Sequence, residues 1–178
     1  MPVTIIATAG ASNANSYASE AEALAYNDAH VSGETFSDAD LDVRRRALAT
    51  ATRMLDANVR FLGVATSLTQ ALQFPRTGLV DPVSGLAVDP AIVPSEVKDA
   101  CAEFARLLIV NDPTKLSDTE IAGLASLKAG DVELAFRDPI AASAAPSRAT
   151  IPASVMAFLR PYLDPTASTT LSRKLSRV

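Results

Sequence analysis

The sequence has 178 residues, of which 48% are hydrophobic and 20% are charged, and its formal net charge is -4. A chain of this length and composition can bury the core of one domain, which excludes wholesale disorder. The negative charge argues against a uniformly basic nucleic-acid-binding protein. Aromatic residues make up only 5% and tryptophan is absent, so we expect a core of small aliphatic side chains on helices.

A single cysteine, Cys101, excludes an intrachain disulfide and a cysteine-rich metal site. The first residues lack the basic and long apolar parts of a signal peptide. No apolar stretch reaches the roughly 20 residues that span a bilayer. We therefore expect no membrane contact and a protein kept in a reducing, aqueous compartment.

The first half of the chain predicts an extended start followed by two helices. Residues 3–7 are rich in β-forming side chains and indicate a short strand or an extended arm. Ser19 is the expected N-cap of a helix that runs to about His30. Ser37 is the expected N-cap of the next helix, with Asp40 at its third position. Helical spacing places the following apolar side chains on one face of that helix: Leu41, Leu48, Ala51, Leu55 and Val59.

Residues 75–94 contain four prolines and two glycines, which excludes a helix. The segment 81–85 is predicted to form a turn between two short extended arms. Pro94 suits a helix start, because its missing N–H would be unpaired there anyway. The helix that follows is expected to end near Asn111 and to bury one apolar face: Val97, Ala100, Cys101, Phe104, Leu107 and Leu108.

The remainder predicts a short helix from Ser117 to Ala125 and a β-hairpin near residues 127–137, turning at Gly130. A helix over 151–164 follows, opened by Pro152, with an apolar stripe of Val155, Phe158, Leu159 and Tyr162. We predict a mainly α protein: a helical bundle with a small β-hairpin, an extended N-terminal arm and an extended C-terminal tail. Its predicted parts are a core over 1–137, a linker over 138–150, the helix over 151–164 and a flexible basic tail over 165–178.

Candidate residues for chemistry are few, so we predict no enzyme, no catalytic residue, no cofactor and no metal site. His30 is the only histidine, which leaves a triad or a metal cluster without partners. Cys101 falls on an apolar helix face, where a thiol is buried and its pKa is raised. Asp38, Asp40 and Asp42 lack the glycine and glutamate of a calcium loop, so they are better explained as acids at a helix start.

The charge is uneven along the chain. Residues 146–178 carry five cations against one acid, a net +4, which leaves -8 for residues 1–145. The basic tail suggests an acidic partner surface or nucleic acid, and the alternative is a solvated terminus. Arg44, Arg45 and Arg46 point in three directions on a helix. Two of them can pair with nearby acids or with a neighbouring subunit, and phosphate contact is the other reading.

Three short phrases mark junctions between extended segments and helices: residues 13–17 (NANSY), 71–78 (ALQFPRTG) and 92–98 (IVPSEVK). Within the second, Phe74 and Arg76 could stack on and pair with single-stranded bases, although a lone aromatic is more often part of a core. With the arginine-bearing helix that ends at Asp56, these phrases resemble the head–tail connector (adaptor) proteins of tailed bacteriophages. Many of those proteins carry the label "DnaT-like single-stranded-DNA-binding protein". The resemblance covers residues 3–112 best.

The resemblance implies a structural virion protein, assembled in the host cytoplasm, that forms a ring, typically of twelve copies, beneath the portal. Such a ring extends the channel for genomic double-stranded DNA, without sequence-specific binding, and provides a platform for stopper or tail-completion proteins. In related adaptors a C-terminal segment embraces the portal, which here suggests Arg173, Lys174 and Arg177. Contacts between subunits are expected from Leu79, Val80, Leu86, Val88, Arg44 and Arg45. The alternative is a DnaT-like single-stranded-DNA-binding protein.

Overall fold

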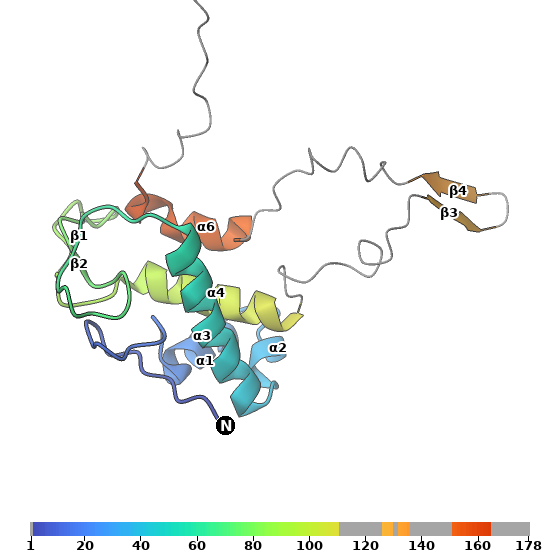
Figure 1. Cartoon of the computed structure of the whole chain (residues 1–178), viewed down its shortest axis with the longest axis horizontal. Coiled ribbons are helices and arrows are strands. Elements are labelled where there is room, and N and C mark those ends of the chain that lie inside the picture. Colours follow the sequence, from blue (N-terminus) through green and yellow to red (C-terminus); the bar gives the residue numbers. More distant parts are fainter. Residues whose placement is uncertain (1, 111–125, 130–131, 136–150, 165–178) are drawn as a thin grey trace, which may run out of the picture. The chain divides into compact units, whose positions relative to one another are not determined.

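A computed structural model of the chain describes residues 2–110, 126–129, 132–135 and 151–164. It is mainly helical, as predicted, and its described residues form two small antiparallel strand pairs, one of which is the predicted hairpin (Figure 1). The described residues fall into two units, the first containing residues 2–110 and 151–164 and the second containing residues 126–129 and 132–135. The expected helix over 117–125, the linker over 138–150 and the tail over 165–178 lie outside the described residues.

The N-terminal arm is extended and forms no strand. The side chain of Asn15 fixes the arm in the way that a neighbouring strand otherwise would. Its Oδ1 accepts from Ile6 N–H and its Nδ2 donates to the Thr4 carbonyl, both at 2.8 Å. Helix α1 (Glu20–Asp28) then begins at Ser19, which is the N-cap as predicted. Ser19 and Glu22 form a reciprocal capping box, which satisfies two N–H groups of the first turn.

The prediction for the second helix was wrong at its start. Ser37 is the last residue of a short helix, α2 (Glu34–Ser37), and its hydroxyl donates to Asp28. The long helix α3 (Leu41–Asn58) begins only after Asp40, which is its N-cap. The extra turn buries Phe36 completely, and the sequence pattern had not assigned that ring to the core. Leu41 is consequently exposed, whereas Leu48, Ala51 and Leu55 are buried as expected.

Helix α4 (Ser95–Val110) is the centre of the first unit and packs against α1, α3 and α6. It starts one residue after Pro94 and ends at Val110, close to the prediction. Small residues such as Ala51 and Ala100 lie at 0% exposure, which permits close packing of the helices. Helix α6 (Ala153–Leu159) continues into the 3-10 turn η2 (Arg160–Tyr162).

The expected core over 1–137 therefore differs from the compact unit. Helix α6 and the η2 turn, which correspond to the predicted helix over 151–164, belong to the core, because Val155, Leu159 and Tyr162 are buried with the residues of α4. The hairpin belongs to the second unit. It pairs β3 (Ser126–Ala129) with β4 (Val132–Ala135) in antiparallel register, with Ala129 opposite Val132, as predicted from Gly130 and its flanks.

A layer of loops over residues 59–94 lies beside the helices (Figure 1). It contains a second strand pair that the sequence did not predict, in which β1 (Val64–Ala65) pairs with β2 (Arg76–Thr77). Gly63 precedes this pair with a φ of +71°, and a Cβ there would lie 2.2 Å from the Thr77 carbonyl oxygen. Only glycine fits this close approach. The predicted turn over 81–85 is present, closed by the Val80–Ala87 bridge.

Candidate functional site

The first two of the three sequence phrases and the end of α3 meet in one place, which we call the junction cluster: Tyr17, Asp56, Gln73, Phe74 and Arg76. The Tyr17 hydroxyl donates to Asp56 Oδ1, and Gln73 N–H donates to Asp56 Oδ2 at 3.3 Å. The Gln73 side chain also donates to the carbonyls of Asp56 and Val59. Residues far apart in the sequence are thereby joined through one carboxylate.

Phe74 fills the apolar side of the junction cluster. It is 2% exposed and packs edge-on against Tyr17 and Phe61, with ring centroids 5.8 and 4.8 Å away. Its peptide bond to Pro75 is cis. Such a buried ring cannot stack on a base, so the core interpretation of Phe74 is the correct one for this structure.

Arg76 ties the loop layer to the junction cluster. Its guanidinium donates to four backbone carbonyls, those of Phe61, Leu62, Gly63 and Gln73, at 2.6–3.2 Å. A planar fork of five N–H donors suits this task, because each donor meets a separate acceptor. The cation is engaged within the chain and organises the segment around β1.

The carboxyl group of Asp56 has a raised pKa. Burial raises its pKa above the ordinary value of 3.8, although the hydrogen bonds from Tyr17 and Gln73 and the charge of Arg76 act in the opposite direction. A raised folded-state pKa means that the folded protein holds this proton more tightly than the unfolded chain. The contribution of Asp56 to stability is then full below about pH 4 and is lost as pH rises through the folded pKa.

We expect Asp56→Asn to remove this pH dependence. Its amide can accept from Gln73 N–H and donate to the Tyr17 oxygen, so the geometry is kept without a buried charge. The stability of D56N relative to wild type should therefore rise with pH, as measured by urea unfolding between pH 4 and pH 8. Asp56→Ala is the contrasting variant, since it leaves donors unpaired and should cost about 1–3 kcal/mol. A pH-independent difference between D56N and wild type would contradict the assignment.

The loop layer carries most of the exposed large hydrophobic side chains of the described residues, and we call this set the apolar loop surface. Ten large hydrophobic side chains are exposed in the described part of the chain, and seven of them lie between residues 62 and 92. They are Leu62, Val64, Leu68, Val80, Val83, Leu86 and Ile92. A concentration of this kind is typical of an interaction site, whereas scattered exposed hydrophobics are not.

The structure separates the four loop residues expected at a subunit interface. Val80 is 58% and Leu86 is 69% exposed, and both belong to the apolar loop surface. Leu79 is only 3% exposed, so the expectation that it lacks cover within its own chain was wrong. It alternates with Val80 along an extended segment, which turns one side chain into the core and the next outward. Val88 is partly buried against the core.

The arginines of α3 are largely used within the chain. Arg44 and Arg45 both pair with Glu20 of α1, at 3.6 and 3.1 Å, and Arg44 also donates to the Ser37 carbonyl. Arg46 is exposed, and its Nε donates to the Asp42 carbonyl. The sequence predicted pairing but not the partner, because Glu20 lies on another helix. Any interface role of Arg44 and Arg45 remains a prediction.

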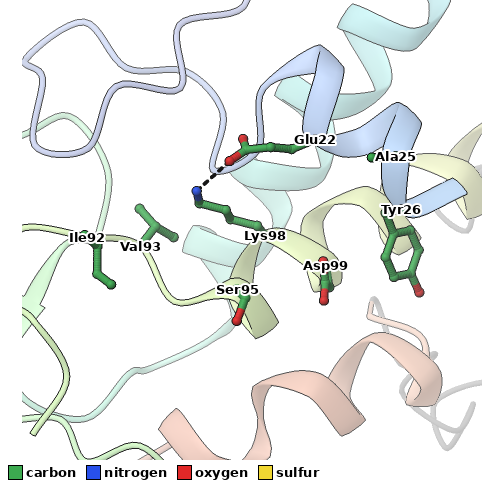
Figure 2. Close-up of a pocket in the computed structure, with 8 residues that line it drawn as sticks. All are labelled: Glu22, Ala25, Tyr26, Ile92, Val93, Ser95, Lys98 and Asp99. Carbon is green, nitrogen blue, oxygen red and sulfur yellow. Dashed lines mark hydrogen bonds and ion pairs between the residues drawn. The ribbon is translucent and has the colours of Figure 1, made fainter. Parts of the chain in front are cut away.

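A groove of about 610 Å³ lies between α1 and the start of α4, and we call it the α1–α4 groove. Its lining residues are Glu22, Ala25, Tyr26, Ile92, Val93, Ser95, Lys98 and Asp99 (Figure 2). Lys98 and Glu22 point toward one another and form an ion pair of 2.6 Å. Sequence reasoning missed this groove, since its two sides come from segments about 70 residues apart.

The single histidine and the single cysteine of the sequence both have contacts within the chain. His30 lies just after α1, where its Nδ1 accepts from Ser32 N–H and its Nε2 is 4.0 Å from Glu103. Cys101 is fully buried, which raises the pKa of its thiol, as predicted. No cluster of metal-ligating side chains occurs among the described residues. No described helix combines the length and the hydrophobicity needed to cross a membrane.

The buried ion pair of α4 had also escaped the sequence analysis. Glu103 and Arg106 are 4% and 7% exposed and form bidentate contacts of 2.8–3.1 Å one turn apart. A spacing of three residues indicates that the two side chains can pair on a helix, but it does not indicate that the pair is buried. The predicted portal-binding residues, Arg173, Lys174 and Arg177, lie outside the described residues.

Comparison with known protein families gives a match over the whole chain. The sequence model of a family described as "Putative DnaT-like ssDNA binding protein" matches residues 1–178. The chain belongs to this family. The match spans all three phrases of the sequence, so the junction cluster lies inside the family's region. Comparisons with curated proteins and with solved structures found no match.

Proposed function

We propose that this DnaT-like family member is a structural head–tail connector of a tailed bacteriophage, an adaptor that forms a ring beneath the portal. In this proposal the ring extends the channel for genomic double-stranded DNA and offers a platform to stopper or tail-completion proteins. Residues 165–178 reach the portal through Arg173, Lys174 and Arg177. The protein acts through interfaces in the virion and carries out no catalysis.

The observation that carries the proposal is the apolar loop surface. Arg76 holds the segment of Leu62 and Val64 through the carbonyls of residues 61–63, and the Val80–Ala87 bridge closes the loop that carries Val83 and Leu86. A partner therefore meets an ordered surface and loses little binding free energy to ordering it. A ring requires two complementary surfaces on every subunit, and an exposed apolar patch is a natural component of one. We assign Val80 and Leu86 to the contact between neighbours.

Single-stranded-DNA binding is the second candidate, and the family description favours it. Binding of that kind usually combines a positive groove with exposed aromatic rings. In this chain Phe74 is buried, Arg76 is engaged by carbonyls, and Arg44 and Arg45 share Glu20. The residues that would first be assigned to DNA therefore have partners within the chain, which argues against single-stranded-DNA binding through them.

Charged substitutions on the apolar loop surface should block assembly. We expect Val80→Asp and Leu86→Asp to fold normally, because both positions are already exposed, and to prevent ring formation on the portal. Each contact between neighbours would bury an unpaired carboxylate, and this penalty of several kcal/mol recurs around the ring. Val31→Asp is the matched control, since Val31 is 96% exposed but lies outside that surface. Rings of normal occupancy from V80D and L86D would refute this interface.

The decisive experiment is cryo-electron microscopy of the protein mixed with its cognate portal. A single-stranded-DNA titration at physiological salt should accompany it on the same preparation, because DNA affinities depend steeply on salt. A ring stacked on the portal, with only weak nonspecific DNA binding, is the expected result. Tight DNA binding without portal association would establish the second candidate.

A further inference from the structure

The α1–α4 groove combines apolar walls with an excess of negative charge. Tyr26 and Ile92 contribute apolar surface, and Ile92 is 49% exposed. Glu22 is neutralised by Lys98, whereas the side chain of Asp99 forms no hydrogen bond or ion pair with any described residue. Asp99 points away from the Lys98–Glu22 pair (Figure 2). A ligand that fits this groove would offer both a cation and apolar side chains.

Among the described residues, the acidic neighbours of Asp99 outweigh the one nearby cation. Burial raises the pKa of Asp99, and the charges of Glu96 and Glu22 raise it further, whereas Lys98 acts in the opposite direction. Glu96 is one turn before Asp99 on α4, and it accepts a hydrogen bond of 3.0 Å from the Tyr162 hydroxyl. The acidic edge of the groove is therefore adjacent to the residues at which the described part of the chain ends.

The chain that continues from this point has the complementary chemistry. Residues 165–178 contain Arg173, Lys174 and Arg177 and no acidic residue. Leu171, Leu175 and Val178 follow one another at intervals of four and three residues, so a helix would place them on one side. Fourteen residues span up to roughly 46–50 Å when extended. That reach is ample, because the chain leaves the described structure two residues after Tyr162.

We propose that the α1–α4 groove is a docking surface for a basic peptide that also carries apolar side chains, and that residues 165–178 of the same chain occupy it. The leucines cover Tyr26 and Ile92, and the cations meet Asp99 and Glu96. The groove thereby holds the segment until a stronger acidic partner displaces it. This inference goes beyond the adaptor function and does not depend on it.

A dye placed at residue 178 tests the contact in the full chain. Val178→Cys offers one reactive thiol, because Cys101 is fully buried. The fluorescence anisotropy of the dye should fall when Asp99 is replaced by lysine, and also between 0.1 and 1 M salt, where the Debye length drops from about 10 to 3 Å. Asp38→Lys is the matched control, an exposed charge reversal at the end of α2 that should leave the anisotropy unchanged. Equal anisotropy in wild type and D99K would overturn the proposal.

A second measurement locates the contact. In the amide NMR spectrum, removal of residues 165–178 should shift the signals of Glu22, Tyr26, Lys98 and Asp99, and a synthetic 165–178 peptide should reverse the shifts. A peptide with its three cations replaced by glutamine should bind about tenfold more weakly. Shifts confined to residues 160–164 would refute the contact. Dependence of the full-chain signal on protein concentration would place the segment in a second copy and refute the intramolecular form. No portal is present, so failure here leaves the adaptor proposal to its own test.

Discussion

The Phe74→Ala variant is expected to lose about 3–5 kcal/mol of unfolding free energy. Phe74 is 2% exposed and contacts both Tyr17 and Phe61, so truncation opens a cavity between the N-terminal phrase and the loop layer. The neighbouring rings cannot close over the gap, because Tyr17 is fixed through Asp56. Since domains of this size are stable by only about 5–15 kcal/mol, a large part of the total would disappear.

Urea unfolding measures this loss, and two variants control it. Phe74→Leu keeps most of the apolar volume and should cost clearly less than alanine. Val83→Ala removes a side chain that is 91% exposed, so its effect should stay within about 0.5 kcal/mol. The same series separates the two candidate functions. A stably folded F74A protein that loses affinity for single-stranded DNA would contradict the core role and support base stacking.

Much of the helical fold could be predicted from local sequence. Three kinds of signal depend only on residues close together in the sequence. They are the capping pair of Ser19 and Glu22, the periodic apolar residues of α3 and α4, and Gly130 between two alternating segments. The prediction that Ser37 is an N-cap was wrong because its role depends on contacts outside the local sequence. Whether Ser37 caps a helix or ends one depends on the burial of Phe36 and on Asp28, which are tertiary contacts.

The candidate surfaces were harder to predict for the same reason. The Pro- and Gly-rich composition of 75–94 indicated loops, but only packing decides that Leu79 turns inward while Val80 and Leu86 turn outward. The ion-pair partner of Arg44 and Arg45 is also distant in the sequence, because Glu20 lies on another helix. Spacing along one element reveals local pairs, and it carries no information about which element will lie opposite.

Replacement of Arg76 by alanine should have the second largest effect, a loss of about 2–3 kcal/mol. Four carbonyls of the loop layer would lose their donor together: those of Phe61, Leu62, Gly63 and Gln73. Water can reach part of this site, because Arg76 is half-buried, and this access keeps the loss below the sum of four separate bonds. Urea unfolding should report the loss, and amide hydrogen exchange should accelerate around β1.

Arg76→Lys distinguishes the shape of the donor from its charge. The lysine ammonium is a compact group with three donors, so it cannot serve four carbonyls that face a planar fork. We therefore expect R76K to recover less than half of the stability lost in R76A. Arg60→Ala is the matched control, an exposed arginine of the same layer, with an expected change within about 0.5 kcal/mol. Full recovery by lysine would mean that positive charge near Asp56, which Arg76 also supplies, matters more than the ordering of the loops. The expected result instead makes Arg76 the residue of the second phrase that orders the backbone beside Leu62 and Val64, and with it part of the apolar loop surface.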